Sequence, residues 1–268
     1  MNSIALRTED VTLAWEKNVI SKNLNVSLPA GAFTAIIGPN GCGKSTLLKA
    51  LARILSPTAG KVFLGEQLMS GMQTRSVAKQ LALLPQHTTT PPDITVAELV
   101  RRGRFPHQSL LKQWSEADSQ AVTAALTAAS VLELADRRVH ELSGGQRQRV
   151  WLAMVLAQNT PVLLLDEPTT YLDISHQYQL LELARSLVTQ LNRTVITVLH
   201  DLQQASRFAD HLVVMNEGKI VAEGAPIEIL TADLISRVFG LSVHIHHVED
   251  NLIIVPTALP SPDVSMLD

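Results

Sequence analysis

Residues 33–46 read FTAIIGPNGCGKST, and this stretch decides the fold. The short apolar run from Phe33 to Ile37 is typical of a fully buried strand. The next nine residues match G-x-x-x-x-G-K-[ST], the pattern of a phosphate-binding loop, and a helix is expected from Lys44 to about Leu55. A strand, a glycine-rich loop and a helix in this order predict a nucleotide-binding α/β fold. Backbone N–H groups of the loop and the helix N-terminus would bind phosphate oxygens.

The loop supplies most of the expected nucleotide contacts. Its residues are Gly38, Pro39, Asn40, Gly41, Cys42, Gly43, Lys44, Ser45 and Thr46. Lys44 should reach the β- and γ-phosphates, and the Ser45 hydroxyl should ligate Mg²⁺. Cys42 is the only cysteine, so no intrachain disulfide can form and the composition fits a reducing compartment. We interpret Cys42 as a small residue that fills the loop, with a regulatory thiol as the alternative.

Further apolar runs predict the rest of the sheet. They lie at residues 81–84, 162–165, 194–199 and 211–215. Because helix-length segments separate most of them, we expect a mostly parallel sheet covered on both faces. Residues 1–30 alternate apolar and polar side chains, which predicts antiparallel strands, and residues 216–218 read as a hairpin turn. The fold class expected is a P-loop NTPase (RecA-like) α/β core with an N-terminal antiparallel β-subdomain and an inserted helical subdomain.

The predicted organisation has four parts. Residues 1–92 form the first part of the nucleotide-binding core, and residues 158–240 form its second part. Between them, residues 93–157 form the helical subdomain, in which residues 131–134 continue the apolar face of an alanine-rich helix at 117–129. Residues 241–268 form a C-terminal extension, and its last stretch, 256–268, is expected to be a frayed tail.

Two carboxylates follow the apolar run Val162–Leu165, which predicts a Walker B strand. A buried parallel strand delivers Asp166 and Glu167 to the carboxyl edge of the sheet, where ligands of such folds bind. Asp166 would hold Mg²⁺, and Glu167 would orient and activate the attacking water.

Residues 142–146 read LSGGQ and open a further helix. Ser143 and Gln146 form a capping-box pattern, so a plain helix cap is one interpretation. It does not explain Gly144 and Gly145, since glycine costs about 1 kcal/mol inside a helix relative to alanine. Glycines there permit close approach of a large anion, and a second helix N-terminus suits a γ-phosphate. The run therefore predicts a dimer in which each chain completes its partner's nucleotide site.

This set of motifs resembles the nucleotide-binding subunits of ABC transporters, from about Ile4 to about Gly240. The resemblance implies ATP, Mg²⁺ and a homodimer, with Ser143, Gly144, Gly145, Gln146 and Asp173 acting on the partner's ATP. It implies that Gln86 touches Mg²⁺ or the attacking water and that His200 contacts the γ-phosphate. Trp15 stands where the family stacks an aromatic ring on adenine, although a core aromatic is the alternative there.

Some phrases are similar to importers of ferric siderophores, of the ferric enterobactin type. They are residues 93–96, 102–108 and 169–177. Cobalamin, haem and other metal-chelate importers use similar subunits and remain alternatives. The resemblance also implies a transmembrane permease, a substrate-binding protein and a peripheral position on the cytoplasmic face of the inner membrane. The permease would dock near Gln86 and residues 93–157; a solvated face is the alternative for the Arg-rich segment 101–108.

Composition and spacing exclude other classes. The net charge of −3 and the scattered Lys and Arg residues argue against nucleic acid as a partner. The sequence shows neither a signal-peptide pattern nor an apolar run of about 20 residues, so we expect a soluble, cytosolic chain. Gln86 and Ser143 are only 57 positions apart, which argues strongly against a chromosome-maintenance or repair ATPase, a class in which very long coiled coils interrupt the cassette there. A soluble cassette for iron–sulfur assembly remains an alternative.

Three histidines near the C-terminus invite a metal interpretation. They are His244, His246 and His247. No cysteine or spaced carboxylate completes a tetrahedral set, so we interpret them as a polar strand face.

Overall fold

A six-stranded sheet forms the centre of the computed structural model, which describes residues 4–16, 18–91, 93–108, 114–170, 172–249 and 251–257. The strands are β3 (Phe33–Ile37), β6 (Leu81–Leu84), β7 (Val162–Asp166), β8 (Thr194–Val198), β9 (His211–Asn216) and β10 (Lys219–Gly224), in the order β10-β9-β3-β8-β7-β6. All neighbouring pairs are parallel except β9 and β10. Every residue of β3, β7 and β8 is buried, as expected when helices or a second layer cover both faces. The predicted α/β fold with a mostly parallel sheet is confirmed.

The predicted hairpin joins β9 and β10. Glu217 and Gly218 both have positive φ, at 47° and 73°, which gives the two-residue turn that matches the twist of paired strands. Asn216 and Lys219 pair across it.

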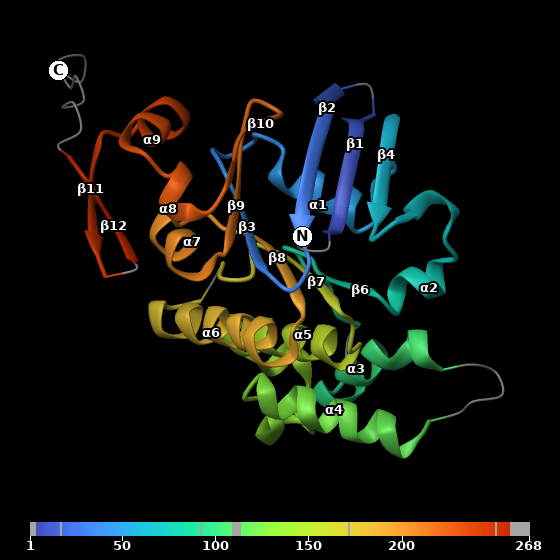
Figure 1. The fold of residues 1–268 in the computed structure, drawn as a ribbon. Coiled ribbons are helices and arrows are strands. Elements are labelled where there is room, and N and C mark those ends of the chain that lie inside the picture. Colours follow the sequence, from blue (N-terminus) through green and yellow to red (C-terminus); the bar gives the residue numbers. More distant parts are fainter. Residues whose placement is uncertain are drawn as a thin grey trace, which may run out of the picture.

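The predicted antiparallel subdomain is a four-stranded sheet. It contains β1 (Ile4–Trp15), β2 (Asn18–Pro29), β4 (Ala59–Leu64) and β5 (Gln67–Leu68), in the order β2-β1-β4-β5. Helix α1 (Lys44–Leu51) lies between this sheet and the central one, as Figure 1 shows. Leu47, Leu48 and Leu51 are fully buried there, so the loop before α1 is anchored by apolar packing on two sides.

Helix α1 ends at Leu51, so the prediction of a helix to about Leu55 was wrong. Arg53 adopts φ of 60°, and the N–H groups of Ile54 and Leu55 both donate to the Lys49 carbonyl. This left-handed residue turns the chain and satisfies the last helical carbonyls. The apolar residues at 54 and 55 continue the hydrophobic pattern without continuing the helix.

Most described residues from 95 to 157 are helical, as predicted for that stretch. They form α3 (Val96–Arg101), η2 (Arg102–His107), α4 (Glu116–Ala128), η3 (Leu132–Leu134), η4 (Val139–Glu141) and α5 (Gly144–Ala157). Two short helices that were not predicted, η1 (Met69–Gly71) and α2 (Thr74–Ala78), lie between β5 and β6. Residues 131–134 do not extend α4: Ser130 adopts φ of 54° and starts a new turn. Val131 and Leu134 are nevertheless buried in the same core. The predicted boundary at residue 93 stays a prediction.

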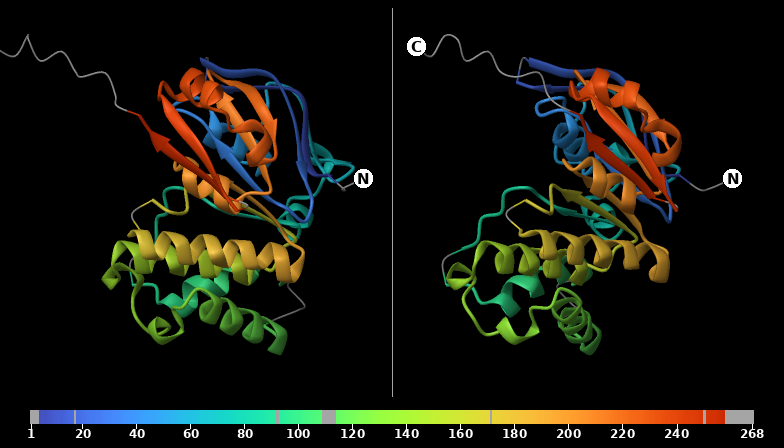
Figure 2. Two further views of the ribbon diagram at one scale, coloured as in Figure 1. Left: turned by 60° about the vertical axis from the view of Figure 1, so that its left-hand side comes forward. Right: turned by 90° about the vertical axis from the view of Figure 1, so that its left-hand side faces the viewer.

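The remaining helices cover the second face of the central sheet and its edge. They are α6 (Ile174–Leu191), α7 (Leu202–Phe208), α8 (Pro226–Ile229) and α9 (Ala232–Phe239). A C-terminal hairpin of β11 (Val243–Val248) and β12 (Asn251–Pro256) packs on α7 and runs along the flank of the core (Figure 2). Most of the predicted frayed tail, residues 258–268, lies outside the described residues. Among the helices described, none has the length and apolar character needed to cross a membrane.

Candidate functional site

The phosphate-binding loop connects β3 to α1 and lies at the carboxyl edge of the central sheet. A Cβ atom at Gly38 would lie 2.1 Å from the Met215 carbonyl oxygen, so only glycine fits between the loop and β9. Gly43 has φ of 105° and begins α1 in a left-handed conformation that other residues rarely adopt. Sequence and fold therefore agree on why the loop is rich in glycine.

Lys44 is buried at the first position of α1. Its ammonium donates to the carbonyl oxygens of Gly38 and Pro39, at 2.9 Å each. These bonds use two of its three donors and hold the charge inside the curl of the loop. A phosphate oxygen in the loop would meet this charge and the positive end of α1 together.

Ser45 and Asp166 are 121 positions apart in the sequence, and the fold brings their side chains together. The Ser45 hydroxyl donates to Asp166 Oδ1 at 2.8 Å. Asp166 ends β7 and is almost fully buried, and this burial raises the pKa of its carboxyl above the ordinary value. A buried carboxylate beside a hydroxyl is a set of hard oxygen donors, which suits Mg²⁺.

Glu167 is the most constrained residue of the site. Its φ of 51° lies in the left-handed region, which a non-glycine residue enters at a cost of about 1–2 kcal/mol. Three side chains hold its carboxylate: Gln86 Nε2 donates at 2.6 Å, His200 Nε2 lies 2.7 Å away, and the Thr170 hydroxyl donates at 3.4 Å. Strand ends β6, β7 and β8 therefore converge on one carboxylate.

Trp15 lies at the end of β1, beside the start of α1. Its indole N–H donates to the Thr46 hydroxyl at 3.3 Å, and the Lys49 ammonium lies 5.4 Å from the ring centroid. The side chain is 45% exposed, which rules out the core-aromatic interpretation. An exposed aromatic face next to the loop is available for a base, and its stacking role stays a prediction.

The predicted capping box is present at the start of α5. Ser143 Oγ accepts from the Gln146 N–H at 3.3 Å, and Gln146 Oε1 accepts from the Ser143 N–H at 3.1 Å. The two glycines differ in their surroundings. A Cβ at Gly144 would meet nothing within 4 Å, whereas one at Gly145 would lie 3.2 Å from Leu172 Cδ2. Packing against Leu172 of the same chain therefore explains why residue 145 is glycine. Of the two glycines, Gly144 is the one that faces open space.

Asp173 caps the N-terminus of α6. Its Oδ1 accepts from the His176 N–H at 2.9 Å, from the Ser175 hydroxyl at 3.1 Å, and lies 2.7 Å from His176 Nδ1. The backbone bond from His176 is the main cause that lowers the pKa of the Asp173 carboxyl. His176 therefore orients the capping carboxylate, which is a structural role.

Other candidate residues lie apart from this constellation. His244 and His246 are exposed on one face of β11, at the flank of the molecule. Within the described ranges, no group of three or more potential ligands could hold a metal ion. Burial raises the pKa of the Cys42 thiol, so it is protonated near neutral pH.

The chain matches a known protein family over more than half of its length. The ABC transporter family profile matches residues 21–170. The chain belongs to the ABC transporter family. Like other members it binds and hydrolyses ATP.

Curated relatives of the cassette match over nearly the full length. The ferric enterobactin transport ATP-binding protein of Escherichia coli is 52% identical over 95% of this chain and 93% of its own. A siderophore transport ATP-binding protein of Bacillus subtilis is 46% identical over 97% of this chain and 94% of its own.

Solved structures share the architecture. An inward-facing ABC transporter assigned to the metal-chelate type has a TM-score of 0.81 at 28% identity, over 96% of this chain and 98% of that one. A dimeric ATP-binding cassette with ADP and Pi bound has a TM-score of 0.74 at 26% identity, over 82% of this chain and 98% of that one.

Some contacts of the cassette could not be read from the motifs. Thr170 touches Glu167, and Lys49 lies over the Trp15 ring. Gln204 donates to Gln177, and each lies four positions along the chain from His200 or Asp173, respectively. The only sequence signal for these residues is their closeness in the chain to a motif, which does not specify a partner.

Proposed function

We propose that this chain is the ATP-hydrolysing subunit of an importer for ferric siderophores. The observation that carries the proposal is the near full-length match to siderophore transport ATP-binding proteins, at 46–52% identity. The competing substrates are cobalamin, haem and other metal chelates. A non-transport cassette is the less favoured alternative.

Hydrolysis would proceed by phosphoryl transfer to water, for which positioned charge matters more than covalent chemistry. Lys44 and the N-terminus of α1 would hold the β- and γ-phosphates of ATP. Glu167, fixed in its left-handed conformation, would accept a hydrogen bond from the attacking water and orient it. His200, which lies 2.7 Å from Glu167, would contact the same water or a γ-phosphate oxygen.

The residues present fit a Mg²⁺ ion bound with ATP. Ser45 Oγ and Asp166 Oδ1 are 2.8 Å apart and offer two hard oxygen donors, and the Gln86 side chain lies beside the adjoining Glu167. When bound there, the ion would neutralise charge on the β- and γ-phosphate oxygens. Asp166 supports this assignment because burial without a cation disfavours its charged form.

The active form would be a homodimer with two ATP molecules at its interface. Ser143 and Gly144 are exposed, and the space around Gly144 is open, so this helix N-terminus is available to a nucleotide held by a second copy. Asp173 is exposed at the N-terminus of α6 and would face the same nucleotide. In this arrangement Ser143, Gly144, Gly145, Gln146 and Asp173 act in trans.

A permease would dock on the helical subdomain. Residues of η2 and its surroundings line a groove of about 560 Å³, with Arg101, Phe105 and Trp114 among the lining residues. Phe105 is 63% exposed, and Arg101 lies 4.8 Å from the Trp114 ring centroid. The groove is lined by apolar and aromatic side chains together with arginines and two carboxylates, Asp93 and Glu98, a mixture that fits a short amphipathic helix of a membrane subunit.

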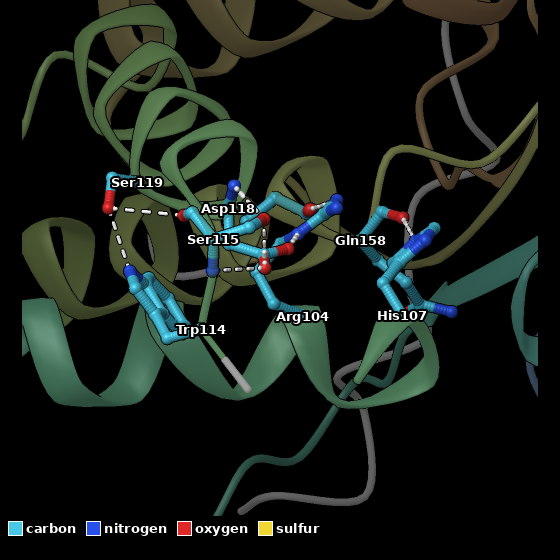
Figure 3. Close-up of polar contacts among 8 residues, drawn as sticks. Arg104, His107, Trp114, Ser115, Asp118, Ser119 and Gln158 are labelled. Atoms are coloured by element: carbon cyan, nitrogen blue, oxygen red, sulfur yellow. Dashed lines mark hydrogen bonds and ion pairs between the residues drawn. The ribbon is translucent and has the colours of Figure 1, made fainter. Parts of the chain in front are cut away.

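The groove rests on a rigid base. Arg104 is buried, and its guanidinium pairs with Asp118 at 2.8 Å and donates to the Ala157 carbonyl at 2.8 Å (Figure 3). His107 bonds the Gln158 carbonyl at 2.7 Å, so η2 is tied to both α4 and α5. A solvated face is therefore wrong for Arg104, although Arg101 and Arg102 are exposed. Docking there would place the cassette on the cytoplasmic face of the membrane as a peripheral subunit.

Reconstitution tests the function. The chain is combined in vesicles with its permease and binding protein, and ATPase activity is measured with binding protein loaded with ferric siderophore, cobalamin or haem. Stimulation by the siderophore-loaded protein alone is expected. Stimulation by a binding protein loaded with another chelate would reassign the substrate. If the chain is neither stimulated by a loaded binding protein nor co-purifies with a permease, a non-transport cassette is favoured.

A paired substitution tests the docking face. Phe105→Ser with Arg101→Ser should abolish co-purification with the permease and leave the basal ATPase activity of the free chain within about twofold. If the variant still binds the permease, the groove is not the docking site.

A further inference from the structure

Two glutamines connect the segment before α6 with the segment before α7. Gln204 Nε2 donates to Gln177 Oε1 at 2.7 Å, and Gln177 Nε2 donates to the Leu172 carbonyl at 3.0 Å. The Leu172 carbonyl can only accept, so the Gln177 amide must present its nitrogen there and its oxygen to Gln204. The direction of both bonds is therefore fixed by chemistry.

Gln204 belongs to the segment that carries His200. It is 5% exposed, and its backbone N–H donates to Asp201 Oδ1, the cap of α7, at 2.8 Å. A buried amide that loses its hydrogen-bond partner is destabilising, so the bond to Gln177 is strongly favoured. Any shift of the start of α7 must then move Gln177 or break this bond.

Leu172 belongs to the segment that carries Asp173, and its side chain packs against the other element of the predicted interface. Leu172 Cδ2 would lie 3.2 Å from a Cβ atom at Gly145. Leu172 thus contacts the start of α5 with its side chain and is held by Gln177 through its carbonyl. One residue links the Ser143 helix start, Asp173 and, through two glutamines, the His200 segment.

The geometry points to Gln177 and Gln204 as positioning residues that couple the γ-phosphate contact at His200 to Leu172–Asp173. The inference rests on the proposed dimer, in which Asp173 faces the partner's nucleotide. A phosphate bound at one site would bias the start of α7, and the two amides would transmit that bias to the residue that completes the other site. Neither glutamine touches a reacting atom.

Gln203 provides a matched control on the same helix. Its amide donates to the Leu252 carbonyl at 2.5 Å and accepts from the Ile254 N–H at 3.0 Å, so it holds β12 and has no bond to Leu172 or Gln177. Gln203→Leu removes the same chemical group one residue away. We expect it to leave kcat within about twofold.

The test compares Gln177→Leu, Gln204→Leu, the double variant and Gln203→Leu in the purified full chain. Each single Leu variant of the pair should lower kcat about tenfold with the KM for ATP within about twofold. The double variant should be no slower than either single one, because both break one link. Its melting temperature should lie above that of Gln177→Leu, since the buried Gln204 amide, which that single variant leaves without its partner, is replaced by an apolar group.

Gln177→Glu separates the two bonds and serves if a Leu variant does not fold. A carboxylate at residue 177 still accepts from Gln204 but cannot donate to the Leu172 carbonyl. It should reproduce the loss of kcat while the protein remains folded.

Three results overturn the inference. They are a kcat in the Gln177 and Gln204 variants equal to that of Gln203→Leu, a kcat that recovers with stability in the double variant, or normal kcat in Gln177→Glu. If the wild-type chain itself neither hydrolyses ATP nor dimerises with it, the proposed function fails instead, so the two failures are distinguishable.

Discussion

Replacing Gly144 by alanine should stabilise the free subunit and lower its ATPase activity about 100-fold. Gly144 is the first residue of α5, and an added Cβ would meet nothing within 4 Å in the same chain. Alanine in a helix is favoured over glycine by about 0.5–1 kcal/mol. For a chain of this size that corresponds to a rise in melting temperature of roughly 1–4 °C.

The same methyl group would stand between the α5 N-terminus and the partner's γ-phosphate. A displacement of about 1 Å at a reacting centre can cost about 100-fold in rate, so we expect a loss of that order in kcat. Melting without nucleotide and steady-state ATPase activity are measured on the same preparation. Gly71→Ala, at a second exposed glycine with nothing within 4 Å of the added Cβ, is the matched control and should keep full activity. Normal turnover by Gly144→Ala would refute the close approach, and a lower melting temperature would refute the open space.

Three further predictions follow from single contacts. Trp15→Ala should weaken ATP binding by the stacking contribution of about 0.5–1.5 kcal/mol, measured by calorimetry, without abolishing turnover at saturating ATP; unchanged affinity would contradict the stacking role. Gly38→Ala should abolish ATP binding, because the added Cβ would lie 2.1 Å from the Met215 carbonyl, and a variant that binds ATP normally would refute the packing argument. Asp118→Asn should lower stability at pH 7 by roughly 3 kcal/mol, since it leaves Arg104 buried without its partner. The Ser115 hydroxyl is the main cause that lowers the pKa of Asp118 to about 2, so its stabilisation is complete above the ordinary value of 3.8. It is lost as the pH falls towards 2, and urea unfolding should show the variant and wild type converging there; a constant gap would contradict it.

The elements that could be predicted from sequence are those whose pattern encodes their geometry. Buried parallel strands appear in a sequence as continuous apolar runs, so β3 and β7 could be predicted from those runs alone. The phosphate-binding loop was found because glycine spacing and a following helix are required together. The end of α1 could not be predicted, because arginine is an ordinary helix residue and nothing in the sequence indicates that Arg53 adopts a left-handed conformation.

What could not be predicted depends on distant parts of the chain. The two glycines of residues 142–146 received one explanation, but Gly145 is explained by Leu172, which lies next to it only in the fold. The left-handed backbone of Glu167 has no local signal, and the Gln86 and His200 side chains that hold its carboxylate follow two other strands. The bond between Gln177 and Gln204 likewise joins two helices whose packing no local pattern specifies.

In the proposed dimer, two copies of this chain enclose ATP between the phosphate-binding loop of one and the α5 N-terminus of the other. Glu167→Gln removes the carboxylate that would orient water and keeps the size of the side chain, so ATP should bind and persist. The decisive measurement is the molar mass of this variant by light scattering, with and without ATP and Mg²⁺. We predict that Glu167→Gln is a monomer without ATP and a dimer with ATP. The double variant Glu167→Gln with Ser143→Arg should remain a monomer with ATP. A monomer in ATP, or wild-type turnover by Glu167→Gln, would contradict it.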